Sequence, residues 1–374
     1  MTDQSKLAWR SMEFYKESSV EFTWGNVTKV DFKNRSVETD DGKKVNYTKL
    51  IMASGGTPKW LPMDGLKGDL ENVFVLRALP HAQGIMKAAG ENGGKKVVVV
   101  GSSFIGMEVG NCLAGMKHDV TIIGMEDEPM SAVMGKELGK TFRGLLEKNG
   151  VKFKLGAEVE GAKPSESNSK MVGSVQLKDG TNLPADLVIE GVRPSTDYLQ
   201  DVKEIQLNKD GSINVNESFE VEGLKDVYAI GDIATYPYHG PGGNGKPVRI
   251  EHWDVAQNAG RSVAGKINDP SAPPKSFIPV FWSALGAQLR YCGNTPNGYD
   301  DVIIQGETDA QKGPSFVAYY YKGEEIVAVA SMMKDPYMTQ SAELMRRKKM
   351  PSKSEIQKGV DILEISFHQR LRFE

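Results

Sequence analysis

The chain has 374 residues, of which 39% are hydrophobic and 25% charged, an ordinary globular balance for two or three domains. Its net charge of −3 excludes a strong long-range attraction to nucleic acid or to anionic membranes. The two cysteines, Cys112 and Cys292, are too few and too far apart for a disulfide scaffold or a Cys-x-x-Cys dithiol.

The N-terminal segment is predicted to consist mainly of strands. We expect a short helix over residues 7–17 and strands over residues 20–53, with Asp41-Gly42 as a hairpin turn. After a proline-containing loop, residues 73–76 are predicted to form a strand and residues 79–90 a helix. The glycine-rich residues 90–94 then indicate a linker.

The clearest motif begins at residue 96. A lysine and four valines predict a buried strand, which runs into a glycine turn and a helix ending near residue 115. This layout binds a dinucleotide pyrophosphate through backbone N–H groups. The predicted contact residues are Gly101, Ser102, Ser103, Phe104, Ile105 and Gly106. A second strand is predicted over residues 119–123, which completes the strand, helix, strand unit.

One sequence pattern occurs twice in the chain. Residues 36–56 and 174–191 share a plan of strand, Asp-Gly hairpin, apolar strand and glycine. If the spacing from Gly101 to Gly180 also applied to Gly42, a first glycine loop would fall upstream of Met1. We therefore expect a first nucleotide-binding unit whose front part lies outside this sequence. The alternative is that two similar hairpins arose independently.

The rest of the chain is predicted to finish this unit and to add two more regions. A helix is expected over residues 133–149, and a strand over residues 227–230 that leads into Gly231-Asp232 and a helix start. Residues 256–268 predict another helix, and the aromatic strands after residue 273 indicate a separate C-terminal domain. The predicted domains are 1–91, a partial FAD-binding domain; 92–198, an NAD(H)-binding domain; 199–272, the returning FAD-binding segment; and 273–374, a C-terminal reductase dimerisation-like domain.

These motifs resemble those of the pyridine nucleotide-dependent FAD flavoprotein reductases, in the branch of apoptosis-inducing-factor-3-like and ferredoxin-reductase-type proteins. The matching segments are residues 51–58, 101–108, 228–232, 251–253 and 281–283. The resemblance implies an α/β fold with two Rossmann-like, three-layer ββα dinucleotide-binding domains, the first incomplete, and a C-terminal α+β domain.

The resemblance also implies an FAD site. Gly231 and Asp232 match the last FAD motif, in which the carboxylate accepts a hydrogen bond from the flavin's ribityl chain. The backbone at Gly55 and Thr57 is expected to pass close to FAD. Flat aromatic side chains near the flavin ring are implied at His252, Trp253 and Trp282. The alternatives are a helix-capping Asp232, a plain turn before Pro58, and tryptophans that belong to the core.

The resemblance also implies that Gly191 contacts NAD(H) and that Glu108 lies near the nicotinamide. Glu108 and Trp282 are the catalytic candidates. A solvent-exposed helix glutamate is the alternative for Glu108. Ser103 replaces the second motif glycine, and Gly124 stands where a carboxylate usually binds the ribose, so we expect Glu126 to substitute. The acidic residues 126–128 would repel a 2′-phosphate, which favours NADH over NADPH.

The predicted function is an FAD-dependent NAD(P)H oxidoreductase that passes electrons to a ferredoxin-like protein, a quinone or a small oxidant. We expect weak FAD retention, and hence impaired turnover, without the first glycine loop. The alternative is a non-catalytic scaffold protein that uses the basic residues 346–349, although such a run is also typical of a solvated helix end.

No metal site is predicted, because the five histidines lack ligand spacing, and no nucleic-acid partner is favoured. We see no apolar run of membrane-spanning length and no secretory signal. The expected location is cytoplasmic, with mitochondrial as the alternative, and a homodimer is the expected assembly.

Overall fold

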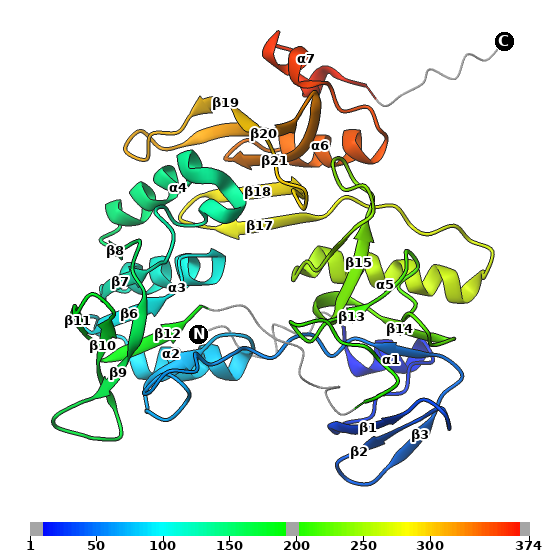
Figure 1. The fold of residues 1–374 in the computed structure, drawn as a ribbon, viewed down its shortest axis with the longest axis horizontal. Helices are drawn as coiled ribbons and strands as arrows, with labels where there is room; N and C mark the ends of the chain where they lie inside the picture. Colours follow the sequence, from blue (N-terminus) through cyan, green and yellow to red (C-terminus); the bar gives the residue numbers. More distant parts are fainter. Residues whose placement is uncertain (1–9, 192–201, 367–374) are drawn as a thin grey trace.

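The computed structural model describes residues 10–191 and 202–366, in which three packed regions surround a common centre (Figure 1). The first region is built on a five-stranded parallel sheet. Its strands, in spatial order, are β5 (Val73–Val75), β12 (Leu187–Glu190), β6 (Lys96–Val100), β7 (Asp119–Ile123) and β8 (Lys152–Lys154). All strand pairs in this sheet are parallel, which explains the nearly continuous apolar sequence of the central strands.

The valines of β6 divide between two cores because successive side chains of a strand point to opposite faces. Val97 and Val99 pack in a cluster with the helices α3 (Phe104–Gly115) and α4 (Ser131–Lys148), and the helix α2 (Leu79–Ala89) joins the same face. Val98 and Val100 pack against a small antiparallel sheet on the other face. Its strands are β9 (Val159–Pro164), β10 (Val172–Leu177) and β11 (Asn182–Pro184).

The second region, on the right of Figure 1, combines early and late parts of the chain. The strand β4 (Leu50–Met52) pairs in parallel with β14 (Val227–Ala229), although about half the chain separates them. Next to this pair lie α1 (Met12–Glu17), the meander β1 (Val27–Asp31), β2 (Ser36–Thr39) and β3 (Lys44–Asn46), the strands β13 (Ile213–Asn214), β15 (Ala234–Tyr238) and β16 (Lys246–Val248), and the helix α5 (Trp253–Asn268).

The C-terminal region is an antiparallel sheet that packs onto the first region. Its strands, in spatial order, are β17 (Val280–Ala284), β18 (Gln288–Gly293), β21 (Glu325–Met332), β20 (Ser315–Lys322) and β19 (Asp301–Glu307). One face joins the core of α3 and α4, and the other packs against α6 (Tyr337–Arg346) and the short helix α7 (Lys353–Gln357). Tyr320 Oη donates a hydrogen bond to the carbonyl oxygen of Met134 at 2.9 Å.

The predicted fold class is confirmed, since parallel α/β sheets are followed by a C-terminal antiparallel domain. The strand at residues 119–123 and the helix ending at residue 115 lie where the sequence predicts them. The helix predicted after Asp232 is wrong. Only a single 3₁₀ turn, η3 (Gly231–Ile233), forms there, and the chain continues as β15, whose aromatic residues pair with β16.

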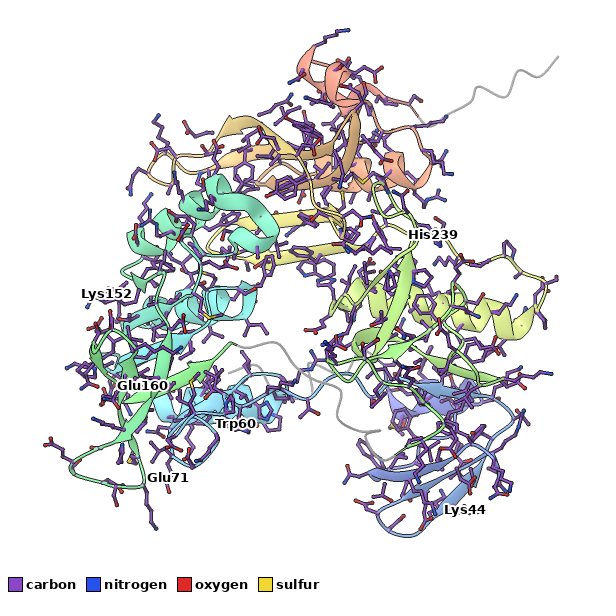
Figure 2. All side chains as sticks on the ribbon, in the orientation of Figure 1. Lys44, Trp60, Glu71, Lys152, Glu160 and His239 are labelled. Carbon is purple, nitrogen blue, oxygen red and sulfur yellow. The ribbon has the colours of Figure 1, made fainter. Side chains whose placement is uncertain are left out.

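The predicted domain boundaries stay predictions, and the one at residue 198 lies outside the described residues. β5 and α2 precede the predicted boundary at residue 91, yet β5 pairs with β12 of the parallel sheet. We therefore propose that the second domain begins earlier, in the loop between β4 and β5. Trp60, labelled in Figure 2, lies in this loop, and its ring is 3.3 Å from the position that a Cβ on Gly68 would take.

Tyr320→Phe tests how the C-terminal sheet is attached to α4. Gly135 has a φ of +79°, which interrupts the helix and exposes the Met134 carbonyl to the Tyr320 hydroxyl. Loss of the hydroxyl leaves a buried acceptor without its donor, so we expect the free energy of unfolding to fall by about 1–2 kcal/mol in urea denaturation. The control Tyr321→Phe, whose ring lies 4.3 Å from Lys353 Nζ, should change it much less. Equal losses would contradict the attachment.

Candidate functional site

Three glycines meet where β6 turns into α3. A Cβ built on Gly106 would lie 1.9 Å from the carbonyl oxygen of Gly101, and one on Gly101 would lie 2.8 Å from that of Gly191. Gly101 also has a φ of +112°, which disfavours a side chain. Only glycine allows these approaches, so the sequence brings the start of α3 directly against the carboxyl ends of β6 and β12.

The N-terminus of α3 has the properties of an anion-binding site. Its N-cap residue is Ser103, which has an extended backbone and makes no side-chain capping hydrogen bond. The helix is 12 residues long, so its first-turn N–H groups and its dipole both favour a negative charge. Phe104 packs edge-on against Phe281 of β17 at 4.8 Å between ring centroids, which fixes the start of the helix beside the C-terminal sheet.

A cavity of about 240 Å³ lies beside α3, and the residues lining it come from the first and second regions. They are Pro58, Leu76, Arg77, Ile105, Glu108, Val109 and Glu251. Glu108 Oε1 accepts hydrogen bonds from Ser283 Oγ at 2.5 Å and from the Ala284 N–H at 3.2 Å. Glu108 is therefore not an open-surface helix glutamate, because β17 fixes its carboxylate at the cavity.

Asp232 lies in the second region and forms an ion pair with Arg77, which directly follows β5 and Leu76. The Asp232 side chain is 9% exposed, so this charge is mostly withdrawn from water. A Cβ on Gly55 would lie 3.2 Å from Arg77 Nη2, which places that glycine at the same cluster. The capping alternative for Asp232 is wrong, because Ile230 is the N-cap of η3.

Arg77 was not predicted from the sequence. The available signal was a cation placed directly after the carboxyl end of a strand, where parallel sheets gather ligand contacts. A fixed positive charge beside a glycine backbone suits a diphosphate, and a buried carboxylate beside it suits hydroxyl donors. Gly55, Arg77 and Asp232 thus fit the diphosphate and ribityl parts of FAD.

Aromatic rings from α5 and β17 meet at the same centre. The Trp282 ring lies edge-on to His252 at 5.1 Å and to Trp253 at 5.8 Å. Each tryptophan is 48% exposed, so the core alternative is wrong and flat ring surface is available. His252 Nδ1 accepts the Asp254 N–H at the start of α5, and burial lowers the pKa of His252, which favours the neutral imidazole.

The roles predicted for Glu126 and Thr57 stay predictions. Glu126 Oε2 accepts hydrogen bonds from the Ser131 N–H at 3.1 Å and from Ser131 Oγ at 3.2 Å, so this carboxylate is already bound at the start of α4. Thr57 is exposed beside the cavity residue Pro58. In the part of the chain that the structure describes, no group of three or more His, Cys, Asp or Glu residues is placed to hold a metal ion.

Comparisons with known proteins identify the family of this chain. The profile described as pyridine nucleotide-disulphide oxidoreductase matches residues 4–260, and the one described as reductase C-terminal matches residues 280–363. The chain belongs to the pyridine nucleotide-disulphide oxidoreductase family. Proteins of this family use FAD and a pyridine nucleotide.

The relatives include apoptosis-inducing factor 3 of Homo sapiens, 35% identical over 360 residues, which span 95% of this chain and 57% of the relative. Monodehydroascorbate reductase 4, peroxisomal, of Arabidopsis thaliana is 32% identical over 84% of this chain and 63% of its own length. This chain therefore spans less than two thirds of these curated relatives.

Solved structures include the covalent putidaredoxin reductase–putidaredoxin complex. It matches with a TM-score of 0.83 and 26% identity over 92% of this chain and 81% of the other. The ferredoxin reductase of the CYP199A2 system from Rhodopseudomonas palustris has the same fold, with a TM-score of 0.85 and 23% identity, over 94% of this chain and 83% of the other.

Gly106→Ala tests the packed glycine turn. Because the new methyl group would lie 1.9 Å from the Gly101 carbonyl, α3 must move, and we expect unfolding free energy to fall by about 1–3 kcal/mol with loss of NADH binding. Gly115→Ala is the matched control on the same helix, since no atom beyond its chain neighbours and the backbone of its own helix lies within 4 Å of its Cβ position. Thermal denaturation and NADH fluorescence titration measure both effects. An unchanged Gly106→Ala protein would contradict the packing.

Glu190 is a second residue missed by the sequence analysis. It ends β12 immediately before Gly191, is 2% exposed, and its Oε2 accepts the Leu61 N–H at 2.8 Å. Its Oε1 is buried with no hydrogen-bond partner among the described residues. Burial raises the pKa of Glu190 to about 8, which favours the neutral form of the carboxyl near pH 7.

The raised pKa of Glu190 predicts a pH-dependent stability. Its stabilising effect is fully present below the unfolded value near 4.5 and is lost as pH rises through about 8. Glu190→Gln should therefore flatten the melting temperature between pH 5 and 9, and should raise it by several degrees at pH 9. Glu160→Gln, on the exposed side of β9 and labelled in Figure 2, is the control. A parallel pH profile for Glu190→Gln and wild type would show that the carboxyl is not protonated.

Proposed function

We propose that this chain takes part in flavin-linked oxidation of NAD(P)H. The pyridine nucleotide binds at the turn between β6 and α3, and FAD lies along Gly55, Arg77 and Asp232. The supporting observation is the cavity that joins these two places, since it is lined by Ile105 and Glu108 from α3 and by Arg77, the partner of Asp232. Sites at the carboxyl ends of parallel strands are typical of dinucleotide binding.

Each side of the cavity has a separate task. FAD, when bound, supplies the acceptor for a hydride from the nicotinamide. The first turn of α3 binds the pyrophosphate of the nucleotide, and Glu108, held by Ser283, orients the groups that enter the cavity. Trp253 and Trp282 present their half-exposed rings to the flavin and keep water from one side.

Glu251 is a positioned acid at the cavity. It pairs with Arg249, whose side chain is 6% exposed and also contacts Asp210 Oδ2 at 3.0 Å. This ion pair holds the segment before α5 in place, directly before His252 and Trp253 at the start of that helix. The N-terminus of α5 would stabilise negative charge on a flavin ring bound beside these residues.

The chemical class of the electron acceptor is also part of what we propose. The putidaredoxin reductase–putidaredoxin complex supports a ferredoxin-like protein, while the monodehydroascorbate reductases support a small oxidant. A quinone, the homodimer and the cytoplasmic or mitochondrial location stay predictions. No helix within residues 10–191 and 202–366 combines the length and apolar character that crossing a bilayer requires.

The scaffold alternative gains no support from the basic residues 346–349. Arg346 and Arg347 both pair with Glu343, at 2.7 Å and 2.5 Å, and these arginines lower the pKa of Glu343 to about 2. The run is therefore partly neutralised where α6 ends, as expected for a solvated helix end.

Asp232→Asn separates the two proposed binding sites. We expect FAD affinity to fall at least about tenfold, because a charge-assisted hydrogen bond is lost, while NADH affinity stays within about twofold. Flavin fluorescence titration and NADH fluorescence titration on the same preparation measure both.

Asp64→Asn is the matched control, since the Asp64 side chain is 95% exposed and is not among the residues that line the cavity. It should leave both affinities unchanged. Equal loss of FAD and NADH binding in Asp232→Asn would place the two ligands in one site, and wild-type chain that binds neither would refute the proposed function.

A further inference from the structure

The carboxyl end of β7 lacks the acidic residue that usually binds ribose. In glycine-loop sites an Asp or Glu about 20 residues after the loop accepts hydrogen bonds from the ribose 2′-hydroxyl. Gly124 occupies that place, directly after β7. A Cβ on Gly124 would lie 2.2 Å from Ser102 Oγ and 2.7 Å from Ser102 Cβ. The Ser102 side chain therefore fills the space from which a carboxylate at position 124 would extend.

The backbone holds this serine and glycine together. The Gly101 N–H donates to the Ile123 carbonyl at 2.9 Å, and the Gly124 N–H donates to the Lys154 carbonyl at 2.9 Å. On the other side of Ser102, its carbonyl accepts the Met130 N–H at 3.0 Å. Because hydrogen bonds hold both backbone segments, moving them apart to admit a side chain at position 124 would cost these contacts.

The nearby acidic residues already have partners in the protein. Glu126 is bound by Ser131, as described above. Asp127 pairs with Lys136 at 2.5 Å, and Glu128, with a 10% exposed side chain, pairs with Arg143 at 3.0 Å. Two of the three carboxylates that the sequence analysis expected to repel a 2′-phosphate are thus paired with cations, and the third is held by Ser131.

We propose that Ser102 and Gly124 together set the specificity of this site for NADH against NADPH, an inference that rests on the proposed function. The serine excludes a carboxylate from the end of β7, so the ribose is recognised without a negative charge. NADH and NADPH then bind with similar affinity, which replaces the NADH preference expected from the acidic run alone.

The binding test uses NADH and NADPH titrated by isothermal calorimetry into wild type and three variants. Wild type should discriminate less than about fivefold between the two nucleotides. Gly124→Glu alone should weaken both, because its side chain meets Ser102. Ser102→Gly/Gly124→Glu should restore NADH binding and prefer NADH at least about tenfold, because the new carboxylate accepts the 2′-hydroxyl and repels the 2′-phosphate.

Glu126→Gln is the matched control, since Glu126 is the carboxylate that the sequence analysis expected to bind the ribose. It should leave the ratio of NADH to NADPH affinity unchanged. A wild-type preference for NADH of about tenfold or more, lost in Glu126→Gln, would overturn the inference and assign the ribose to Glu126.

A second measurement needs no nucleotide. Gly124→Ala should lower the melting temperature by several degrees in wild type and by much less in Ser102→Gly, since Leu155 Cδ2, 3.2 Å from the new Cβ, is the free end of a side chain. Additive effects would overturn the coupling while leaving the proposed function intact. Wild type that binds neither nucleotide would overturn the proposed function and the specificity, while this cycle would still report on the coupling.

Discussion

The carbonyl oxygen of Gly101 lies so close to Gly106 that even a methyl group would not fit between them. Because of this contact, α3 starts directly at the carboxyl ends of β6 and β12, and its axis is set by backbone rather than by side chains. Gly191 completes the contact from the neighbouring strand. The first-turn N–H groups and Glu108, one turn further along the helix, are therefore fixed relative to the sheet before any ligand is considered.

The other side of the cavity depends on contacts between distant parts of the chain. Arg77 leaves β5 in the first region, while Asp232 follows β14 in the second, and their ion pair joins the two. Ser283 of β17 adds the third region through its hydrogen bond to Glu108. The cavity thus lies between the first and second regions, and the third region holds its Glu108 carboxylate. In such an arrangement two cofactors can meet while each is bound by its own scaffold.

Local patterns predicted the parts of the fold that local interactions form. The strand β7 and the helix α3 follow from a continuous apolar run, a glycine turn and helical periodicity. Arg77 and Ser283 could not be predicted in the same way, because each contacts a residue more than 150 positions away. The helix predicted after Asp232 was wrong for a related reason, because β15 depends on its pairing with β16 rather than on a local sequence pattern.

Electrostatics shows the same dependence on tertiary structure. Residues 126–128 are three consecutive carboxylates, and counting their charges predicts an acidic rim. In the fold, α4 brings Lys136 and Arg143 back to two of them, and its first turn binds the third. Glu190 illustrates the converse, because burial rather than sequence keeps a single carboxyl neutral beside the glycine turn. The charge at this sheet edge is therefore determined by which side chains the tertiary fold brings beside it. The packing of Ser102 on Gly124 depends on the fold in the same way.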